Sequence, residues 1–376
     1  MNNSLALIKL VQFGSRDSWH ARNAPLVIDG QYILIPAYRA DGVGIQAMIR
    51  ICVMFLARQA GATYVHLPFL RLEHQYIDPI GRTLTTIEWG QRWERFLNLG
   101  KDEFHLTDLA NVMGEATLAR HLSAEGRQYG DPQDARRNIL PGLVEKIRSH
   151  DSSAAGIYTF NLGICRQPRE CQLFFDAEFI RVLQDKFEAN GYKPEEILYS
   201  EQYLNIAIHI RRGDVWDACQ AGSKNMMYTN KLVSEEYYVE LLQRLHNLFG
   251  SSPKPLCFHM FSDGRPENFG SFTFMGNSEA VLKLNGGLRI ENIRFHLRQN
   301  TMDTLYHMIK APIFVPGKST FSVLALLLGK SHVLYENEIR DFYQYGFLEM
   351  YMKQNPRFIP LSEAEGKIED VIEALS

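Results

Sequence analysis

Residues 315–322, with the sequence VPGKSTFS, place a Gly-Lys pair before two hydroxyl side chains, as the phosphate-binding P-loop does. That pattern also needs a glycine five residues before Gly317, and the residue there is Pro312, which has no N–H and a fixed φ. The sequence therefore does not predict a P-loop. It predicts that a strand ends at Gly317 and a helix begins at Ser319 or Thr320, whose free N–H groups and dipole form an anion site. An ordinary helix cap is the alternative.

A second stretch, IAIHIRRGDVWD, ends a strand with His209, Arg211, Arg212 and Asp214. Two adjacent arginines beside a glycine suit a diphosphate, because each guanidinium donates to phosphate oxygens in pairs. Alternate side chains of a strand share a face, so His209 and Arg211 are expected to point together and Arg212 oppositely. Asp214 is expected to orient one arginine through an ion pair. A surface arginine pair with an aspartate partner is the alternative.

A third stretch, FSDG at residues 261–264, also ends a strand. Ser262 and Asp263 have the hydrogen-bonding groups to contact a ribose or a base. The same tripeptide is common in turns, and a plain turn is the alternative.

The elements around these stretches indicate an α/β fold. Residues 32–36 are typical of a strand, 41–44 of a turn and 45–58 of a helix, and a further strand follows. Such a βαβ unit predicts a parallel sheet.

The second half shows the same alternation. Strands are expected at 203–210 and 256–262, with a helix at 234–249 whose N-cap is Ser234. The alternation continues through 288–297, 303–311, 312–316, 320–329 and 332–336. Two Rossmann-like halves leave a cleft, and ligands of such sheets bind beyond the carboxyl ends of the strands.

Length and composition limit the class of protein. A chain of 376 residues exceeds what one hydrophobic core usually supports, so two domains are expected. With 45% hydrophobic and 22% charged residues, it is neither disordered nor fibrous as a whole. The net charge of -3 gives no global attraction to nucleic acid, so no nucleic-acid partner is expected.

The cysteines and the hydropathy favour a cytoplasmic protein. The five cysteines form no C-x-x-C pair, which favours reduced thiols. There is no recognisable secretion signal and no run of 18 apolar residues, so no transmembrane segment is expected.

Together, HIRRGD, FSDG and MDTLYHMIKAPIFVPGKSTFSVLALLLG resemble, in order and approximate spacing, the peptide motifs of the fucosyltransferase superfamily. Residues 41–68 look like its N-terminal strand-turn-helix, although Ile45 and Gln46 stand where an asparagine is usual. Val323 and Leu324 replace a Trp-Trp pair common in α1,2 members, which disfavours that subgroup. Residues 70–200 match no motif of the superfamily.

The resemblance implies a GT-B fold, in which two Rossmann-like domains face a central cleft. It implies an inverting, metal-independent transfer of fucose from GDP-fucose to a hydroxyl of a glycan or protein acceptor, with no cofactor. Residues 1–195 would form the acceptor domain, residues 196–345 the donor domain, and residues 346–376 a helical segment packing back on the domains.

The resemblance also implies roles for single residues. Arg211 would contact the β-phosphate and stabilise the leaving GDP. Asp41 would occupy the place of the general base, with a plain turn aspartate as the alternative and Glu73 and His74 as weaker candidates. The implied donor-binding residues are His209, Arg212, Asp214, Ser262, Asp263, Asp303, Ser319, Thr320, Phe321, Ser322, Gly42 and Gly44.

Two other functions stay open at this point. The arginine segment would also suit a different nucleotide sugar, such as another GDP- or UDP-hexose. A non-catalytic protein that only binds a nucleotide sugar would keep the same residues. No motif indicates the acceptor or the linkage.

Overall fold

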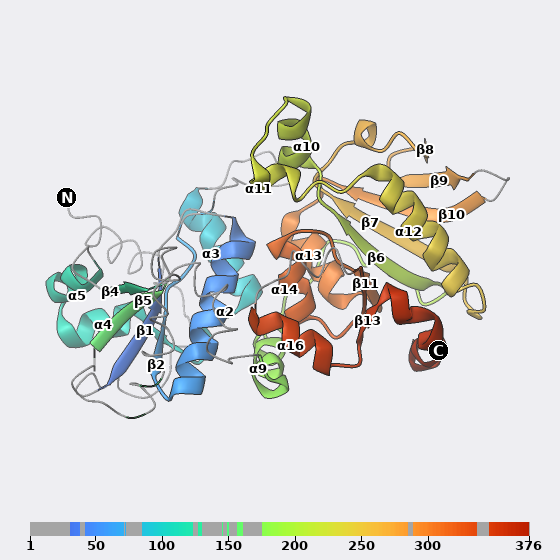
Figure 1. Cartoon of the computed structure of the whole chain (residues 1–376). Helices are drawn as coiled ribbons and strands as arrows, with labels where there is room; N and C mark the ends of the chain where they lie inside the picture. Colours follow the sequence, from blue (N-terminus) through green and yellow to red (C-terminus); the bar gives the residue numbers. More distant parts are fainter. Residues whose placement is uncertain are drawn as a thin grey trace. The chain divides into compact units, whose positions relative to one another are not determined.

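The computed structural model of the chain contains two compact units (Figure 1). Unit 1 comprises Met1–Tyr192 with Gln344–Tyr351, and unit 2 comprises Lys193–Tyr343 with Met352–Ser376. The structure describes residues 31–37, 42–70, 72, 85–122, 127–129, 145, 149, 156–160, 175–284, 289–336 and 346–375. All three sequence stretches considered above lie in unit 2. The acceptor and donor roles of the two domains stay predictions.

Unit 1 is built on a five-stranded parallel sheet with the order β3-β2-β1-β5-β4. The expected strand at 32–36 and the parallel sheet are confirmed. The strands are β1 (Tyr32–Pro36), β2 (Thr63–His66), β3 (Phe104–His105), β4 (Arg127–Tyr129) and β5 (Gly156–Phe160). The helices are α2 (Val43–Ala60), α3 (Thr86–Leu97), α4 (Leu106–Met113), α5 (Glu115–Leu122) and α9 (Ala177–Glu188).

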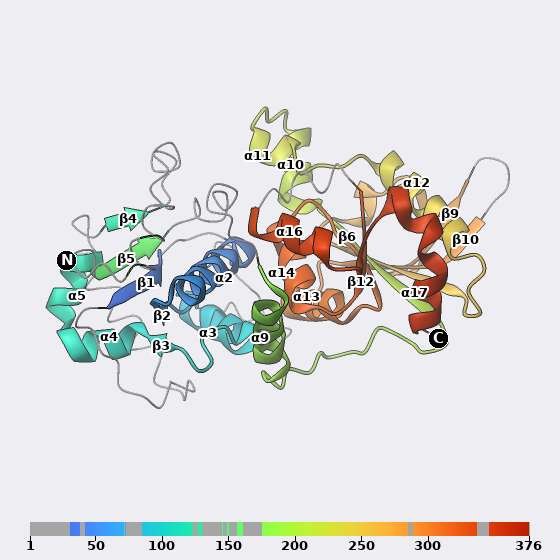
Figure 2. The same cartoon turned by 60° about the horizontal axis from the view of Figure 1, so that its bottom comes forward.

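Helix α2 lies against β1 and β2 (Figure 2) and is the helix expected at 45–58. Within the described residues, it is the one helix long and apolar enough to cross a membrane, but 78% of it is buried inside the protein. Its composition is therefore that of a core helix. The buried Arg50 donates to the carbonyls of Gln46, Leu67 and Pro68 at 2.7–2.9 Å, which fixes the segment after β2.

Unit 2 is built on an eight-stranded sheet with the order β13-β12-β11-β6-β7-β10-β9-β8. Its strands are β6 (Leu204–Ile210), β7 (Leu256–Ser262), β8 (Phe272–Met275), β9 (Glu279–Lys283), β10 (Arg289–Leu297), β11 (Ile313–Val315), β12 (His332–Tyr335) and β13 (Phe358–Pro360). Strands β13 through β10 in that order run parallel, while β9 pairs antiparallel with both of its neighbours, β10 and β8. The alternation expected for the second half is confirmed, and the antiparallel β8–β9 pair is an addition that the sequence analysis missed.

Unit 2 contains the helices α10 (Gly213–Gln220), α11 (Met226–Thr229), α12 (Glu235–Leu248), α13 (Thr301–Lys310) and α14 (Thr320–Leu328). Three of them, α12, α13 and α14, were expected from the sequence, whereas α10 and α11 were not. Ser234 caps α12 by accepting from the N–H of Tyr237 at 3.3 Å, as predicted. Helix α13 begins at Thr301, ahead of the expected Asp303, because Asn300 caps it through the N–H of Met302.

The C-terminal segment differs from the helical segment predicted for 346–376. It contains α16 (Gly346–Gln354), β13, a 3₁₀ helix η4 (Leu361–Gly366) and α17 (Ile368–Leu375). Strand β13 extends the sheet of unit 2 by pairing with β12. The structure of β13 depends on its pairing with β12, which no local sequence pattern records, so it was not expected.

The two faces of the sheet in unit 2 differ in polarity. On β6, Ile206, Ile208 and Ile210 belong to the apolar core that includes Leu241 and Leu245 of α12. The intervening His209 contacts α14, so α12 and α14 cover opposite faces (Figures 1 and 2). The α12 face is specified by apolar packing, and the α14 face carries polar side chains that need hydrogen bonds.

Two of these polar side chains are the imidazoles of His259 and His296, whose rings are nearly parallel and which are 0% and 4% exposed. The amide nitrogen of Asn205 donates to the carbonyls of Ser200 and Tyr203, so its Oδ1 is the atom that faces His259 Nε2 at 3.1 Å. Nε2 of His259 therefore carries the proton, and Nδ1 accepts from His296 Nε2 at 3.0 Å. Both rings are neutral in this arrangement.

Burial is the main cause of their low basicity. It lowers the pKa of His259 to about 2 and that of His296 to about 3, and nearby His307 and Arg294 add to the effect. Burial also lowers the pKa of His209 to about 3. Each ring resists protonation while the unit is folded.

We expect the free energy of unfolding to decrease as the pH falls below about 6.5, the value of a free imidazole. Below that pH the unfolded chain takes up protons on His209, His259 and His296 that the folded chain refuses, so stability is lost on acidification. Each histidine contributes up to about 1.4 kcal/mol per pH unit. Urea unfolding at a series of pH values measures the slope.

Two variants separate titration from packing. His296→Phe should reduce the slope by the share of one histidine, whereas Phe261→Leu, which removes the ring stacked on His296, should lower stability equally at every pH. A slope in His296→Phe equal to that of the wild-type protein would contradict the explanation.

Candidate functional site

The carboxyl ends of β6, β7 and β11 meet at one edge of the sheet in unit 2. The parallel register pairs Ile210 with Ser262 and Ile208 with Val315. The segments that follow, 211–214, 263–264 and 316–319, are therefore neighbours, as the sequence analysis expected of residues just after the strands.

Arg211 lies at this edge between two carboxylates. Its NH1 pairs with Asp263 Oδ2 and its NH2 pairs with Asp214 Oδ1, and its side chain is 22% exposed. The expected ion pair between Asp214 and an arginine is confirmed. The pairing with Asp263 was missed, because Asp263 lies 52 positions after Arg211 along the chain and no local pattern connects them.

Asp263 holds both arginines of the segment. While Oδ2 pairs with Arg211, Oδ1 accepts from the backbone N–H of Arg212 at 2.9 Å. A β-carbon at Gly213, which has a φ of +46°, would lie 2.6 Å from Asp263 Oδ2, so this position needs glycine. Both carboxylate oxygens thus position the arginine segment, and the contact of Asp263 with a ribose or a base stays a prediction.

Arg212 points away from Arg211 into the interior, as the strand alternation predicts. It is 0% exposed, and its guanidinium carbon lies 5.3–5.7 Å from the ring centroids of Trp216, Tyr238 and Phe269. Its NH1 donates to the carbonyl of Val233 at 2.7 Å. Burial lowers the pKa of Arg212, although nearby acidic groups oppose this. With no exposed surface, Arg212 anchors the segment and does not reach a ligand directly.

His209, Ser322 and Gly317 join β6 to the start of α14. Ser322 Oγ accepts from the N–H of Gly317 at 3.1 Å, and its own hydrogen can donate to His209 Nδ1 at 2.6 Å. The proton of the neutral His209 ring then lies on Nε2. Ser322 is 0% exposed and holds His209 and Gly317 together, and its part in donor binding stays a prediction.

Three residues at the start of α14 stay accessible: Ser319, Thr320 and Phe321 are all partly exposed. Ser319 is the N-cap, and its Oγ accepts from the N–H of Phe321 at 3.2 Å. The ring of Phe321 lies 6.0 Å from that of His209. The helix start expected at Ser319 or Thr320 is confirmed, and the strand β11 that occupies 313–315 leaves no room for a P-loop after Pro312.

Two further residues implied in donor binding lie near this edge. Ser262 ends β7, is 6% exposed, and accepts from the N–H of Gly264 at 3.1 Å. Asp303 lies in the first turn of α13, and its carboxylate acts to raise the pKa of His307, which burial lowers. Both are largely enclosed by the unit.

Unit 1 contains the remaining residues implied in donor binding. Gly42 is the N-cap of α2, with no side-chain cap among the described residues, and Gly44 lies in its first turn. Asp41, implied as the general base, lies outside the described residues, as do Glu73 and His74.

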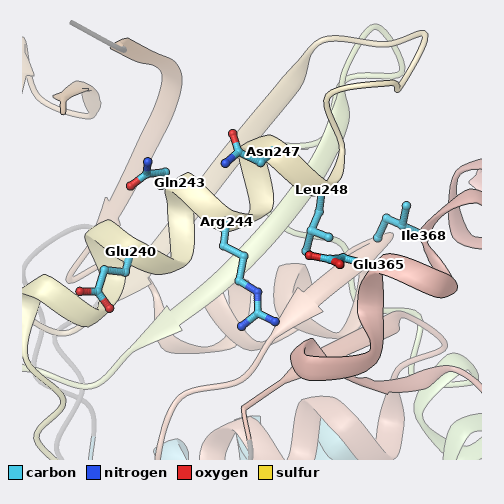
Figure 3. Close-up of a pocket in the computed structure, with 7 residues that line it drawn as sticks. All are labelled: Glu240, Gln243, Arg244, Asn247, Leu248, Glu365 and Ile368. Atoms are coloured by element: carbon cyan, nitrogen blue, oxygen red, sulfur yellow. The ribbon is translucent and has the colours of Figure 1, made fainter. Parts of the chain in front are cut away.

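The described residues contain no group of histidine, cysteine, aspartate and glutamate that could hold a metal ion. A pocket of about 500 Å³ lies between α12 and the C-terminal segment (Figure 3). It is lined by Glu240, Gln243, Arg244, Asn247, Leu248, Glu365 and Ile368. None of the implied site residues lines it, so this pocket is not the candidate site.

No protein-family model matches the sequence, and no curated protein sequence matches it. Among solved structures, the chain is similar to the fucosyltransferase NodZ from Bradyrhizobium, with 13% identity over 80% of this chain and 93% of that chain and a TM-score of 0.36. It is also similar to POFUT1 in complex with GDP-fucose, with 13% identity over 82% and 97% of the chains and a TM-score of 0.37. A NodZ α-1,6-fucosyltransferase co-crystallised with GDP gives 13% identity, 80% and 93% coverage and a TM-score of 0.35.

The close approach of Gly317 to β6 yields a stability prediction. A β-carbon at Gly317 would collide with the carbonyl oxygen of His209, so Gly317→Ala must displace α14 or β6. We expect it to lower the free energy of unfolding by about 1–3 kcal/mol, the usual cost of overpacking. Gly366→Ala, where a β-carbon meets open space, should change it by less than about 0.5 kcal/mol. Urea unfolding compares the two variants, and equal stabilities would refute the packing argument.

Proposed function

We propose that this protein is a glycosyltransferase that transfers fucose from GDP-fucose to a hydroxyl of a glycan or protein acceptor, with inversion and without a metal ion. The observation that carries the proposal is Arg211, a partly exposed guanidinium held at a sheet edge beside the start of α14. Guanidinium groups and helix N-termini are the groups that bind diphosphates in proteins.

The proposed transfer breaks one bond and forms another at C1 of fucose. The bond between C1 of fucose and the β-phosphate oxygen breaks, and its electron pair stays on GDP. The acceptor oxygen bonds to C1 from the opposite side and gives its proton to a base. Arg211 stabilises the charge that grows on the departing phosphate, as a metal ion would otherwise do. We propose Asp41 as the base, on the resemblance alone.

The residues around Arg211 keep it in place. Asp263 and Asp214 orient the guanidinium, Arg212 anchors the segment in the core, and the pair of His209 and Ser322 fixes β6 against the start of α14. The exposed side of Ser319 and Thr320, together with the N–H groups of the helix start, would contact the phosphates. We also propose that the protein acts in the cytoplasm.

A nucleotide panel tests the donor. We expect GDP and GDP-fucose to raise the melting temperature in the absence of magnesium, because a ligand that binds only the folded state stabilises it. UDP and ADP should raise it less. Equal stabilisation by UDP would favour a different nucleotide sugar, and binding of GDP-fucose without hydrolysis or transfer would favour a protein that only binds it.

Arg211→Ala tests the catalytic role. We expect loss of about 3 kcal/mol or more of transition-state stabilisation, a rate decrease of more than about 100-fold, with little change in the melting temperature. Arg244→Ala is the matched control: it removes an arginine bonded to Glu336 and the carbonyl of Leu361, so it should lower stability and leave the specific activity unchanged. The measurement is the rate of fucose transfer at a constant concentration of folded protein. Activity of Arg211→Ala within about threefold of wild type would mean that Arg211 is structural.

A further inference from the structure

Strand β10 ends in an unusual backbone conformation at the same sheet edge. Arg298, the residue after Leu297, has a φ of +53°, in the left-handed region that side chains other than glycine, asparagine and aspartate rarely adopt. Its N–H donates to the carbonyl of Ser262 at 2.9 Å. Strained backbone of this kind persists where the surroundings impose it, and it is concentrated at binding sites.

The side chain of Arg298 is available for a ligand. It is exposed, and its guanidinium makes no ion pair or hydrogen bond within the part of the chain that the structure describes. Arg211 at the same edge already has two carboxylate partners, and Arg212 is buried. Arg298 thus carries an uncommitted guanidinium on a residue whose backbone is bonded to Ser262, the neighbour of Asp263 in the chain.

The strand order sets the distance between Arg298 and the phosphate groups. Along the edge the strands follow the order β11-β6-β7-β10, with Ser319 after β11, Arg211 after β6 and Arg298 after β10 (Figure 1). Two strand spacings, roughly 10 Å, separate β6 from β10. A nucleoside diphosphate whose phosphates lie at β6 and β11 would place its ribose over β7 and its base at the end of β10.

A guanidinium in that place suits one base in particular. Guanine presents two acceptors, O6 and N7, to which an arginine fork can donate together, whereas adenine presents N7 beside a donor amino group. We infer that Arg298 is a specificity-determining residue that binds the O6 and N7 edge of the guanine base. This inference rests on the proposed function, because it assumes that the ligand is a guanine nucleotide.

Arg298→Gly is the informative variant, because glycine adopts a positive φ without strain and the fold should be kept or stabilised. Calorimetric titration with GDP, inosine diphosphate and ADP measures the effect. We expect the preference for GDP over ADP to fall about tenfold. The ratio of GDP to inosine diphosphate should not change, because both bases carry O6 and N7.

Two control variants distinguish bidentate hydrogen bonding by the guanidinium of Arg298 from the effect of its positive charge. Arg298→Lys keeps the positive charge and loses the fork, so it should lose the same preference. Arg289→Ala removes an exposed arginine from the opposite end of β10 and should behave as wild type. The inference would be overturned if Arg298→Gly or Arg298→Lys kept the wild-type preference for GDP over ADP. In that case binding of GDP by the wild-type protein would still support the proposed function. A wild-type protein that binds no GDP would remove both.

Discussion

The arrangement of the candidate site depends on the carboxylate of Asp263. From the end of β7 it bonds the backbone of Arg212 and the side chain of Arg211, which both follow β6. One group thereby fixes where the chain leaves β6 and where the exposed guanidinium points. Gly213 must be glycine because this carboxylate comes so close to the backbone.

The sheet beneath the site is specified differently on its two faces. Against α12, apolar side chains such as Ile208 and Leu245 fill space, and many similar residues would serve. Against α13 and α14, the neutral rings of His209, His259 and His296 each make a directional hydrogen bond, His209 with Ser322 and the other two with each other. The site is built on the second face, where α14 is held in register with β6 by directional bonds rather than by packing alone.

Periodic elements could be predicted from the sequence, and contacts between distant residues could not. The strands at β1, β6 and β7 and the cap at Ser234 follow from local pattern, and the structure has them where expected. The burial of Ser322 and the bonding of Asp263 depend on which strands become neighbours, and no local pattern records that. The same limit explains why β8, β9 and β13 were missed, since short strands at or next to a sheet edge owe their structure to the sheet that they join.

The two carboxylates beside Arg211 differ in how firmly they are held, and this bears on how an anion would reach the arginine. Asp263 is tied by a second bond, to the N–H of Arg212, whereas Asp214 lies in the first turn of α10; their exposures are similar, 38% and 45%. A carboxylate in the first turn of a helix is favoured there by the helix dipole whether or not it has an arginine partner. An incoming diphosphate would therefore displace Asp214 from Arg211 and leave Asp263 in place. Arg211 would keep its orientation while it exchanged the carboxylate of Asp214 for a phosphate. The attraction for the ligand would then come from the N–H groups at the start of α14 as much as from the charge of Arg211.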